Sequence, residues 1–419
     1  MRPARDRTRG AEPQTGDCDE AWLTGMKYTL FLTQQCNLAC KYCYVAKKPV
    51  RMALSVAEKI VDFAYRNTPP AEDINIGFFG GEPLLEFPLL QQIVRTIEGH
   101  EGFDACRVHA SVVTNGTLLT EEMIRYFRRH NIDLTLSCDG PPGIHDRFRR
   151  FPDGSGSSGL VEDAIRRTLG VLGRAPVSAV YGPDTIGCLV ETIDYFSSLG
   201  VRQIYVSPDF SARWTEAGIE RVPAIYKSVA ERYMKFYREG REHFISVIDA
   251  KIAVLLRGGY QPLERCRMGT GEFAFTASGH VLPCERLAAR EPEEHSIGAT
   301  NGLIDIGPLR DHFTPGPPVN TPCLSCGIQE YCMNWCGCSN YFMTGSYNRV
   351  SPFLCASERA LIAVAFDVLR TLEEELGPTF VDHVGGLALA PSERPPKDQA
   401  LKGGLRILPG PLDRELTAN

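Results

Sequence analysis

The run Gln34-Gln35-Cys36-Asn37-Leu38-Ala39-Cys40-Lys41-Tyr42-Cys43 places three cysteines on one short loop, with the spacing C-x3-C-x2-C. Residues 28–33, directly before it, are β-branched, aromatic and apolar and predict a strand that leads into the loop. Three thiolates can bind three irons of a [4Fe–4S] cluster and leave the fourth iron open to a small molecule. The alternative is a zinc loop, although structural zinc sites usually pair two C-x2-C arms.

The composition is that of a soluble globular protein without a broad positive surface. The 419 residues are 43% hydrophobic and 23% charged, and the net charge is −6, which gives no support for nucleic-acid binding. No apolar run reaches the roughly 18 residues of a membrane-spanning helix, and the N-terminus lacks the apolar core of a secretory signal. We therefore expect a cytoplasmic protein, with neither a membrane nor a nucleic acid among its partners.

Fifteen cysteines are many for the cytoplasm, where clustered cysteines more often bind metal than form disulfides. Three lie at 36–43, and eight lie between 266 and 355. The other four are scattered. Cys18 receives no role, and Cys106, Cys138 and Cys188 are interpreted as small buried apolar residues.

Strand and helix patterns alternate along the first half of the chain, which predicts a parallel sheet covered by helices. Unusual polar residues fall where the strands end, so a curled partial barrel fits better than an open sheet. The expected strands are 28–33, 74–79, 108–113, 132–137, 177–181 and 203–206, and the expected helices are 54–66, 84–97, 120–129, 161–172 and 185–199.

The same patterns divide the chain into six parts. The predicted parts are a flexible N-terminal tail (1–25), a partial barrel (26–208), a helical bridge (209–261), a cysteine-rich domain (262–360), a C-terminal helix (361–376, the end of a helical pattern that starts at 357) and a disordered tail (377–419).

Cys36, Cys40 and Cys43, with Tyr42 before the last of them, resemble the signature of the radical S-adenosylmethionine (SAM) enzymes. The resemblance implies a partial (β/α)6 barrel, a [4Fe–4S] cluster on the three cysteines, and SAM bound at the open iron next to Tyr42. In that family the cluster reduces SAM to a 5′-deoxyadenosyl radical, which takes a hydrogen atom from the substrate. An external electron donor of the flavodoxin or ferredoxin type is the implied partner.

Further motifs of this family follow the predicted strands. Gly80-Gly81-Glu82-Pro83 ends the second strand, where glycines let the backbone approach a ligand, and the family uses this motif to bind the ammonium group of SAM. Asn115, Ser137 and Asp139 lie at the ends of the third and fourth strands, where the family places contacts to ribose and carboxylate. Arg149 matches a family arginine near the SAM carboxylate, and a solvated surface charge is its alternative interpretation.

The cysteines of the second half resemble the SPASM extension of radical SAM enzymes, over about residues 262–360, whereas a zinc-ribbon region is the alternative. The resemblance implies two auxiliary [4Fe–4S] clusters, and therefore three clusters in all. The implied ligands are Cys323, Cys326, Cys332 and Cys355 for one cluster and Cys266, Cys284 and Cys336 for the other.

The second set departs from fully ligated family members. Those members carry a further cysteine shortly before the position of Cys266, and residues 258–265 contain none. The fourth iron is therefore open, bound by substrate, or bound by Cys338, which is the spare thiol nearest to Cys336.

Glu285 directly follows Cys284. Sulfatase-maturating relatives carry an acidic general base at this position, so we predict that Glu285 accepts the proton released when a substrate radical is oxidised. A surface carboxylate is the alternative.

These features predict a radical SAM/SPASM enzyme that oxidatively modifies a peptide or protein, for example by a thioether or carbon–carbon cross-link in a ribosomal peptide product. Few residues precede the first strand, so we expect precursor recognition by a separate protein, the barrel surface or the tail. The first alternative is an anaerobic sulfatase-maturating enzyme that forms formylglycine from Cys or Ser. The second is a non-catalytic iron–sulfur electron carrier, which would not need the motif at residues 80–83.

Overall fold

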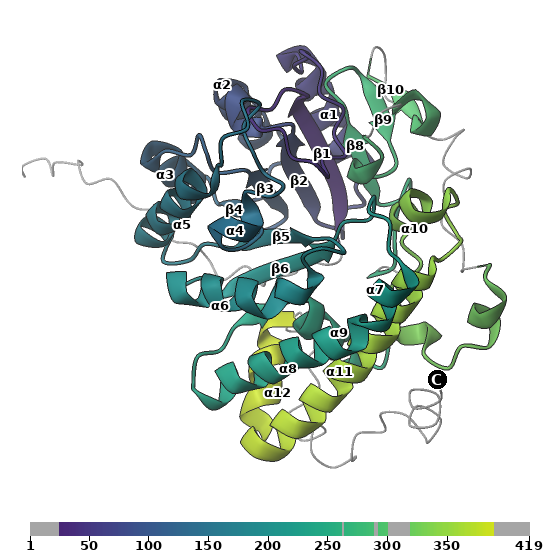
Figure 1. The fold of residues 1–419 in the computed structure, drawn as a ribbon. Helices are drawn as coiled ribbons and strands as arrows, with labels where there is room; N and C mark the ends of the chain where they lie inside the picture. The colour runs from purple at the N-terminus through teal and green to yellow at the C-terminus, as the bar shows by residue number, and fades with distance from the viewer. Residues whose placement is uncertain (1–24, 262–263, 289–291, 301–318, 389–419) are drawn as a thin grey trace, which may run out of the picture.

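The computed structural model describes residues 25–261, 264–288, 292–300 and 319–388, and one sheet forms the centre of this part of the chain (Figure 1). Its strands are β1 (Met26–Thr33), β2 (Ile74–Gly80), β3 (Val108–Thr114), β4 (Ile132–Ser137), β5 (Val177–Tyr181), β6 (Gln203–Pro208), β7 (Phe244–Ile245), β8 (Glu272–Phe275), β9 (His280–Leu282) and β10 (Gly298–Ala299). Their order is β10-β9-β8-β1-β2-β3-β4-β5-β6-β7.

The first six strands are parallel neighbours and form the predicted partial (β/α)6 barrel. The helices are α1 (Leu54–Asn67), α2 (Phe87–Glu98), α3 (Glu121–Arg129), α4 (Pro142–His145), α5 (Ser158–Leu172), α6 (Leu189–Leu199), α7 (Glu216–Glu220), α8 (Val222–Arg238), α9 (Ser246–Leu256), α10 (Gly337–Thr344), α11 (Pro352–Leu376) and α12 (Pro378–Ala388). Short 3-10 segments are η1 (Pro83–Glu86), η2 (Ile186–Cys188), η4 (Glu285–Leu287), η5 (Pro292–His295), η7 (Thr321–Ser325) and η8 (Gln329–Tyr331).

The two faces of β1 differ because successive side chains of a strand point in opposite directions. Tyr28 and Leu30 are buried in the main core, where the Tyr28 ring meets Phe63 of α1 edge-on at 6.0 Å between centroids. The opposite face carries Thr29 and Phe31, and we call it the inner face of the sheet. The helices cover the outer face, which carries Tyr28 and Leu30. The inner face is therefore where we expect the reaction site.

The cysteine-rich region continues the barrel sheet. β8 pairs in parallel with β1, with Lys27 opposite Glu272 and Thr29 opposite Ala274, and β9 returns antiparallel to β8 (Figure 1). This long-range pairing was not predicted, because the strands are short and distant in sequence. It brings the segment after β9, which contains Cys284, to the inner face beside β1.

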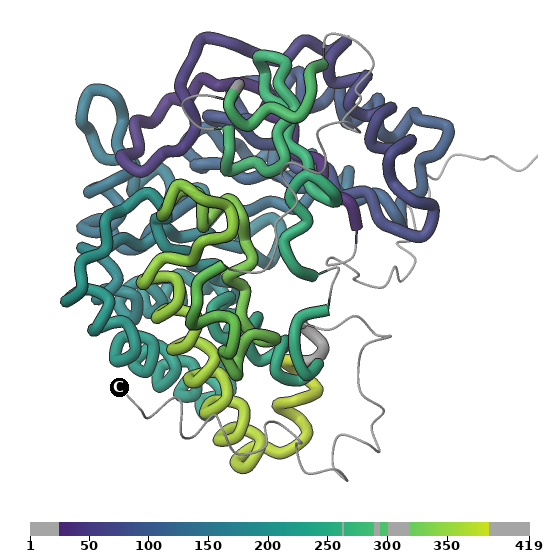
Figure 2. Tube along the Cα trace, turned by 90° about the vertical axis from the view of Figure 1, so that its right-hand side faces the viewer, coloured from purple at the N-terminus to yellow at the C-terminus, as the bar shows by residue number. Residues whose placement is uncertain are grey.

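The bridge and the C-terminal helices form a second layer of α8, α9, α11 and α12 (Figure 1, Figure 2). The bridge was predicted as helical, yet it also contains β7, which pairs with β6. α11 begins at Pro352 rather than at residue 357, because the Ser351 hydroxyl caps it by accepting a hydrogen bond from the Leu354 amide at 3.2 Å.

The prediction of a disordered tail from residue 377 is wrong for 378–388, which form α12. Phe380 and Val384 of this helix are buried, and the Phe380 ring meets Tyr237 of α8 edge-on at 5.0 Å. Apolar burial therefore outweighs the Gly- and Pro-rich composition there. Residues 389–419, residues 1–24 and Cys18 lie outside the described residues. Every helix in the described ranges is too short or too polar to cross a membrane.

Candidate active site

The loop after β1 carries the first three cysteines at the carboxyl edge of the barrel strands. Cys36 and Cys40 are half-buried and Cys43 is exposed. The Leu38 amide donates a hydrogen bond to Cys36 Sγ at 3.4 Å, and the Cys43 amide donates to the Cys40 carbonyl at 3.3 Å. The loop is anchored because the Leu38 side chain is fully buried. Three thiols thus share one short, anchored loop, which fits three ligands of a [4Fe–4S] cluster.

The two glycines at the end of β2 let this strand lie directly against the cysteine loop. A Cβ on Gly81 would lie 2.0 Å from the Gln35 carbonyl oxygen, and Gly80 has a φ of +138°, a conformation that L side chains rarely adopt. The amides of Gly81 and Glu82 donate to the carbonyls of Thr33 and Gln35 at 2.9 and 2.8 Å. The glycine motif therefore fixes the position of the cysteine loop. The contacts of Gly80, Gly81 and Pro83 with SAM stay predictions.

Glu82 connects the ends of β2 and β3. Its buried carboxylate accepts hydrogen bonds from the Thr114 hydroxyl at 2.6 Å, from the Asn115 amide at 2.8 Å and from the Leu84 amide at 3.0 Å. Burial raises the pKa of Glu82 above its ordinary value, although the three donors favour the charged form. Glu82 is thus engaged by the protein itself rather than presented freely to a ligand.

Asn115 reaches from the end of β3 to the cysteine loop. Its side-chain amide donates to Asn37 Oδ1 at 2.9 Å and lies 3.9 Å from Cys36 Sγ. Asn115 therefore helps to position Cys36, so the end of β3 belongs to the same site as the cysteine loop.

Tyr42, Asp139 and Arg149 meet in one buried group, although the sequence predicted each of them separately as a SAM contact. Arg149 Nε lies 3.0 Å from Asp139 Oδ2, the Tyr42 hydroxyl donates to the same oxygen, and the Val180 amide donates to Oδ1 at 2.9 Å. The Arg149 guanidinium also lies over the Tyr42 ring, 5.3 Å from its centroid. Arg149 is buried, so it is not the solvated surface charge of the alternative interpretation.

Ser137 is half-buried at the end of β4, opposite Ser178 of β5. Its proposed contact with SAM also stays a prediction. Of the predicted residues at the strand ends, Glu82, Asn115 and Asp139 are therefore the ones whose side chains connect separate elements of the site.

His145 supports this group and was not assigned a role from the sequence. Its ring is fully buried, Nδ1 accepts a hydrogen bond from the Asp139 amide at 3.3 Å, and Nε2 lies 2.9 Å from the Ser157 hydroxyl. Ser157 in turn donates to the Arg149 carbonyl at 2.7 Å. Burial, assisted by the nearby Arg149 charge, lowers the pKa of His145 to about 4, so the ring is neutral near pH 7. No sequence pattern distinguishes such a histidine from a surface one.

Glu285 lies at the inner face, in contact with β1. Its Oε2 is 3.0 Å from Lys27 Nζ and accepts a hydrogen bond from the Thr29 hydroxyl at 3.0 Å. Lys27 Nζ also lies 3.3 Å from Glu272 Oε1, so two carboxylates share one ammonium group. Burial acts to raise the pKa of Glu285, but the Lys27 charge and the hydrogen bonds outweigh it, and the pKa lies below its ordinary value.

The cysteine loop and Glu285 belong to one packed region. Val45, two residues after Cys43, packs in an apolar cluster with Phe31 of β1 and with Leu282 and Ala288, which flank Glu285 in sequence. Tyr44 packs against the same cluster and interacts electrostatically with Glu285. The first cysteine loop and the cysteine-rich region therefore face the same inner surface.

The cysteines of the second half fall into two groups. In one, Cys323 and Cys326 lie in and directly after η7, Cys332 follows η8 and Cys355 lies in the first turn of α11, and their thiols are close enough to interact electrostatically. The other group contains Cys266, Cys284 and Cys336, which pack together with buried Cys338. The two ligand sets that the sequence predicted are thus assembled separately, and their ligand roles stay predictions.

Among the described residues, no three His, Cys, Asp or Glu side chains are arranged to hold a single metal ion. The other three described cysteines differ in burial. Cys138 is buried, which raises its pKa to about 12 and makes the thiol unreactive, as the interpretation of a small apolar residue requires. Cys188 is half-buried. Cys106 is exposed because it lies in the connection between α2 and β3, so the prediction of burial is wrong for it.

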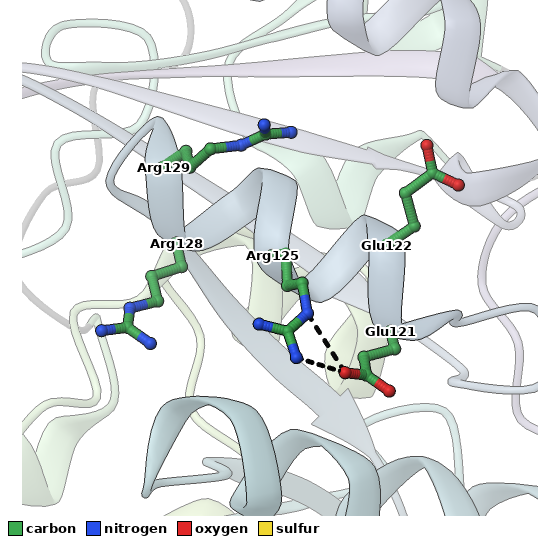
Figure 3. Close-up of a pocket in the computed structure, with 5 residues that line it drawn as sticks. All are labelled: Glu121, Glu122, Arg125, Arg128 and Arg129. Carbon is green, nitrogen blue, oxygen red and sulfur yellow. Dashed lines mark hydrogen bonds and ion pairs between the residues drawn. The ribbon is translucent and has the colours of Figure 1, made fainter. Parts of the chain in front are cut away.

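A hollow on the protein surface lies apart from these groups. It is lined by five charged residues that all come from α3 (Figure 3). Arg125 Nε donates to Glu121 Oε1 at 3.1 Å, an ion pair one helical turn apart. Neighbouring opposite charges on one exposed helix are a common stabilising pattern and need no ligand. The lining residues are Glu121, Glu122, Arg125, Arg128 and Arg129.

Comparison with known proteins agrees with this geometry. The profile of the Radical SAM superfamily matches residues 30–196. A serine-type anaerobic sulfatase-maturating enzyme of Klebsiella pneumoniae is 30% identical over 333 residues, which are 75% of this chain and 82% of the relative. The chain belongs to the radical SAM superfamily.

This radical SAM protein is also similar to a named cyclopropyl synthase and to a solved structure that contains a bound peptide. The radical SAM cyclopropyl synthase TigE of Paramaledivibacter caminithermalis is 23% identical over 339 residues, which are 73% of this chain but only 66% of the relative. The solved structure of anSMEcpe with bound AdoMet and the Cp18Cys peptide has a TM-score of 0.70 and 18% identity, and the match covers 84% of this chain and 99% of that chain. The structural likeness shows the fold.

We predict that Asp139→Ala destabilises the radical SAM protein strongly. Removing one partner of a buried ion pair leaves the other charge unpaired, which costs about 3–5 kcal/mol, and Arg149 is that charge here. Urea unfolding of the iron-free, reduced protein would measure the change. In the control Glu121→Ala, which removes an exposed ion pair with Arg125, the loss should stay below about 1 kcal/mol. Equal losses in both variants would contradict the role of Asp139.

His145 should make stability depend on pH. Its folded pKa of about 4 lies below the reference value of 6.5, so its contribution is complete above pH 6.5 and is lost as the pH falls toward 4. The lost stability amounts to about 2 kcal/mol at pH 5. The free energy of unfolding, measured with urea, should fall between pH 7.5 and pH 5 in the unmodified protein. In His145→Asn this fall should be smaller by about 2 kcal/mol. The same decline in both proteins would show that His145 does not titrate in this way.

Proposed function

We propose that this radical SAM protein oxidatively modifies a residue of a peptide or protein. One observation carries the proposal: the first cysteine loop and Glu285 of the cysteine-rich region pack against the same inner face, through Val45, Tyr44 and the cluster around Phe31. A site for making a radical thus shares one packed inner surface with a residue that can accept a proton, as the oxidation of a substrate residue requires.

The residues of the first loop fit the group that the superfamily uses. Cys36, Cys40 and Cys43 would hold a [4Fe–4S] cluster, and the amide donors of Leu38 and Asn115 next to Cys36 Sγ suit a thiolate ligand. With SAM bound, this group supplies a 5′-deoxyadenosyl radical that takes a hydrogen atom from the substrate. We further propose auxiliary [4Fe–4S] clusters at the two cysteine groups of the second half, an external donor of the flavodoxin or ferredoxin type, and precursor recognition by a separate protein.

The substrate class is supported by the relatives. The Klebsiella pneumoniae relative is named for maturing sulfatases, which are proteins, and the solved structure of anSMEcpe contains a peptide. We infer a peptide or protein substrate for this chain as well. Membership of an enzyme superfamily favours this proposal over the alternative of a non-catalytic electron carrier.

Glu285 would accept the proton in the proposed reaction. Lys27 and Thr29 both contact Oε2 and hold the carboxylate in one orientation at the inner face. When a substrate residue loses a hydrogen atom to the 5′-deoxyadenosyl radical and then an electron to one of the proposed auxiliary clusters, its second hydrogen leaves as a proton, and a positioned carboxylate can take it. Lys27 and Thr29 act through Glu285 and are positioning residues.

A second candidate is the formation of formylglycine from Cys or Ser in a sulfatase. It is favoured by the identity of 30% to the Klebsiella pneumoniae enzyme and by the position of Glu285 directly after Cys284. The two candidates differ in their substrate and share the same residues.

The deciding experiment uses the anaerobically reconstituted protein with reductant, SAM and two peptides that carry the Cys or the Ser of a sulfatase maturation site. Oxidation of either peptide to the aldehyde would establish the second candidate. Formation of 5′-deoxyadenosine with both peptides unchanged would favour a dedicated precursor peptide. Absence of 5′-deoxyadenosine under all conditions would overturn the proposed function.

Replacing Cys36, Cys40 and Cys43 together by Ala should abolish 5′-deoxyadenosine formation, because no thiolates remain to hold the cluster that binds SAM. Iron should fall by about four of about twelve atoms per chain, since the auxiliary groups keep their cysteines. Iron analysis and chromatography of the nucleoside would measure both. Cleavage of SAM at the original rate by this variant would refute the assignment of the first loop.

Glu285→Gln should separate the two halves of the reaction. The amide keeps the shape of the side chain but does not accept the substrate proton, so 5′-deoxyadenosine should still form while modified peptide falls by about 100-fold or more. Mass spectrometry of a converted peptide would show this. Glu162→Gln is the control, because Glu162 pairs with Arg166 on the surface of α5 and should leave both products unchanged. Normal peptide conversion by Glu285→Gln would exclude the carboxylate as the base.

A further inference from the structure

Cys338 is part of a continuous group of four thiols that come from three separate segments. Its Sγ lies 3.5 Å from Cys336 Sγ, and its thiol also forms a hydrogen bond with Cys284. Cys336 in turn contacts Cys266. The contacts therefore run in the order Cys266, Cys336, Cys338, Cys284, so Cys338 joins Cys284 to the other two cysteines.

We propose that Cys338 is the fourth ligand of a [4Fe–4S] cluster held by Cys266, Cys284 and Cys336. The inference rests on the proposed function, since it deepens the assignment of one auxiliary cluster. The missing cysteine before residue 266 leaves one iron without a protein ligand, and Cys338 would bind that iron. Every iron of this cluster would then be bound by the protein.

The surroundings of Cys338 differ from those of an ordinary buried cysteine. Cys338 and Cys138 both have 2% of their surface exposed. Cys138 Sγ faces the carbonyl oxygen of Gly140 at 3.6 Å, which is a local backbone contact. Cys338 instead lies between two other thiols. Burial alone therefore does not explain the placement of Cys338, whereas a shared ligand does.

Two backbone amides and a helix N-terminus lie next to thiols of this group. The amides of Met268 and Gly337 donate hydrogen bonds to the Cys266 thiol. Cys336 is the N-cap of α10 and Cys338 lies in its first turn, where the helix dipole stabilises negative charge. Hydrogen bonds to ligand sulfurs are a common feature of iron–sulfur sites.

Arg286 adds a positive charge beside the same group. Its guanidinium interacts electrostatically with the thiols of Cys284, Cys336 and Cys338. The Ser339 hydroxyl accepts a hydrogen bond from Arg286 at 3.3 Å, and the Phe210 ring lies 4.4 Å from the guanidinium. These contacts hold the cation in place. A fixed cation offsets the negative charge of several thiolates in a partly buried site.

Glu272 is the competing candidate for the fourth position, and its contacts argue against it. Its Oε1 lies 3.6 Å from Cys284 Sγ, but the same oxygen lies 3.3 Å from Lys27 Nζ. Binding iron would therefore require the carboxylate to leave its ion pair. Iron–sulfur clusters are generally ligated by thiolates, and Cys338 offers one without breaking a pair.

A single zinc ion is the competing metal at these four cysteines. A structural zinc ion requires four sulfurs at about 2.3 Å from one point, and no three such side chains among the described residues are arranged in this way. A [4Fe–4S] cluster presents four irons at separate corners, so each thiol of the chain of contacts can bind its own iron. Substrate would then be held by side chains rather than by this cluster.

The test uses the full-length protein with Cys36, Cys40 and Cys43 replaced by Ala, so that only auxiliary clusters remain. Iron, sulfide and zinc are measured after anaerobic reconstitution, and the electron paramagnetic resonance spectrum is recorded after reduction, with and without cyanide. Cys338→Ala is added to this background. Cys138→Ala is the matched control because both cysteines are equally buried, and Cys266→Ala is the positive control.

The background should hold about eight irons per chain and show no response to cyanide. Cys338→Ala should match Cys266→Ala, with the loss of about four irons or a spectrum that shifts when cyanide binds the exposed iron, while Cys138→Ala should match the background. A Cys338→Ala protein that matches Cys138→Ala in iron and spectrum would overturn the proposal. One zinc in place of about four irons in the background would overturn it too.

These readouts are independent of the proposed function, because the background lacks the first cluster and no turnover is measured. Failure of the unmodified protein to form 5′-deoxyadenosine would overturn the proposed function and leave the ligand assignment standing. If Cys338→Ala left iron and spectrum unchanged while the unmodified protein formed 5′-deoxyadenosine, the ligand assignment would be overturned and the proposed function would stand.

Discussion

The parallel pairing of β8 with β1 is the constraint on which the site depends. It joins the cysteine-rich region to the barrel as part of one sheet and sets Lys27 opposite Glu272. With this pairing, the segment after β9 lies at the inner face, where Glu285 meets Lys27 and Thr29. In the proposed reaction, the first cysteine loop and Glu285 could act together only if this pairing holds.

A second constraint is electrostatic and lies at the opposite end of the strands. The buried Asp139 carboxylate joins Tyr42 of the cysteine loop, Arg149 and the Val180 amide. His145 accepts a hydrogen bond from the Asp139 amide. A buried charge is tolerated only when it is paired and hydrogen-bonded, so these groups hold one another in place. The rigid positions of the loop and of the strand ends follow from this mutual requirement.

Local patterns predicted much of the fold. Strand and helix alternation predicted β1 to β6 and the helices between them, except the short α4, to within a few residues, because each element carries its own apolar periodicity. The same patterns missed β7, β8 and α12. These elements are short or compositionally unusual, and they form because distant segments bury them, as Tyr237 does for Phe380.

The sequence by itself determined which reactive groups are available. Residue types and their spacing are enough to recognise the C-x3-C-x2-C loop, the glycine motif, the second set of cysteines and the carboxylate after Cys284. Tertiary structure alone decided which of these groups meet. Asp139 and Arg149 form a pair, Cys338 joins Cys336 and Cys284, and Glu285 faces Lys27. Spacing along the chain reports only local geometry, whereas these contacts depend on the register and packing of segments that are far apart in sequence.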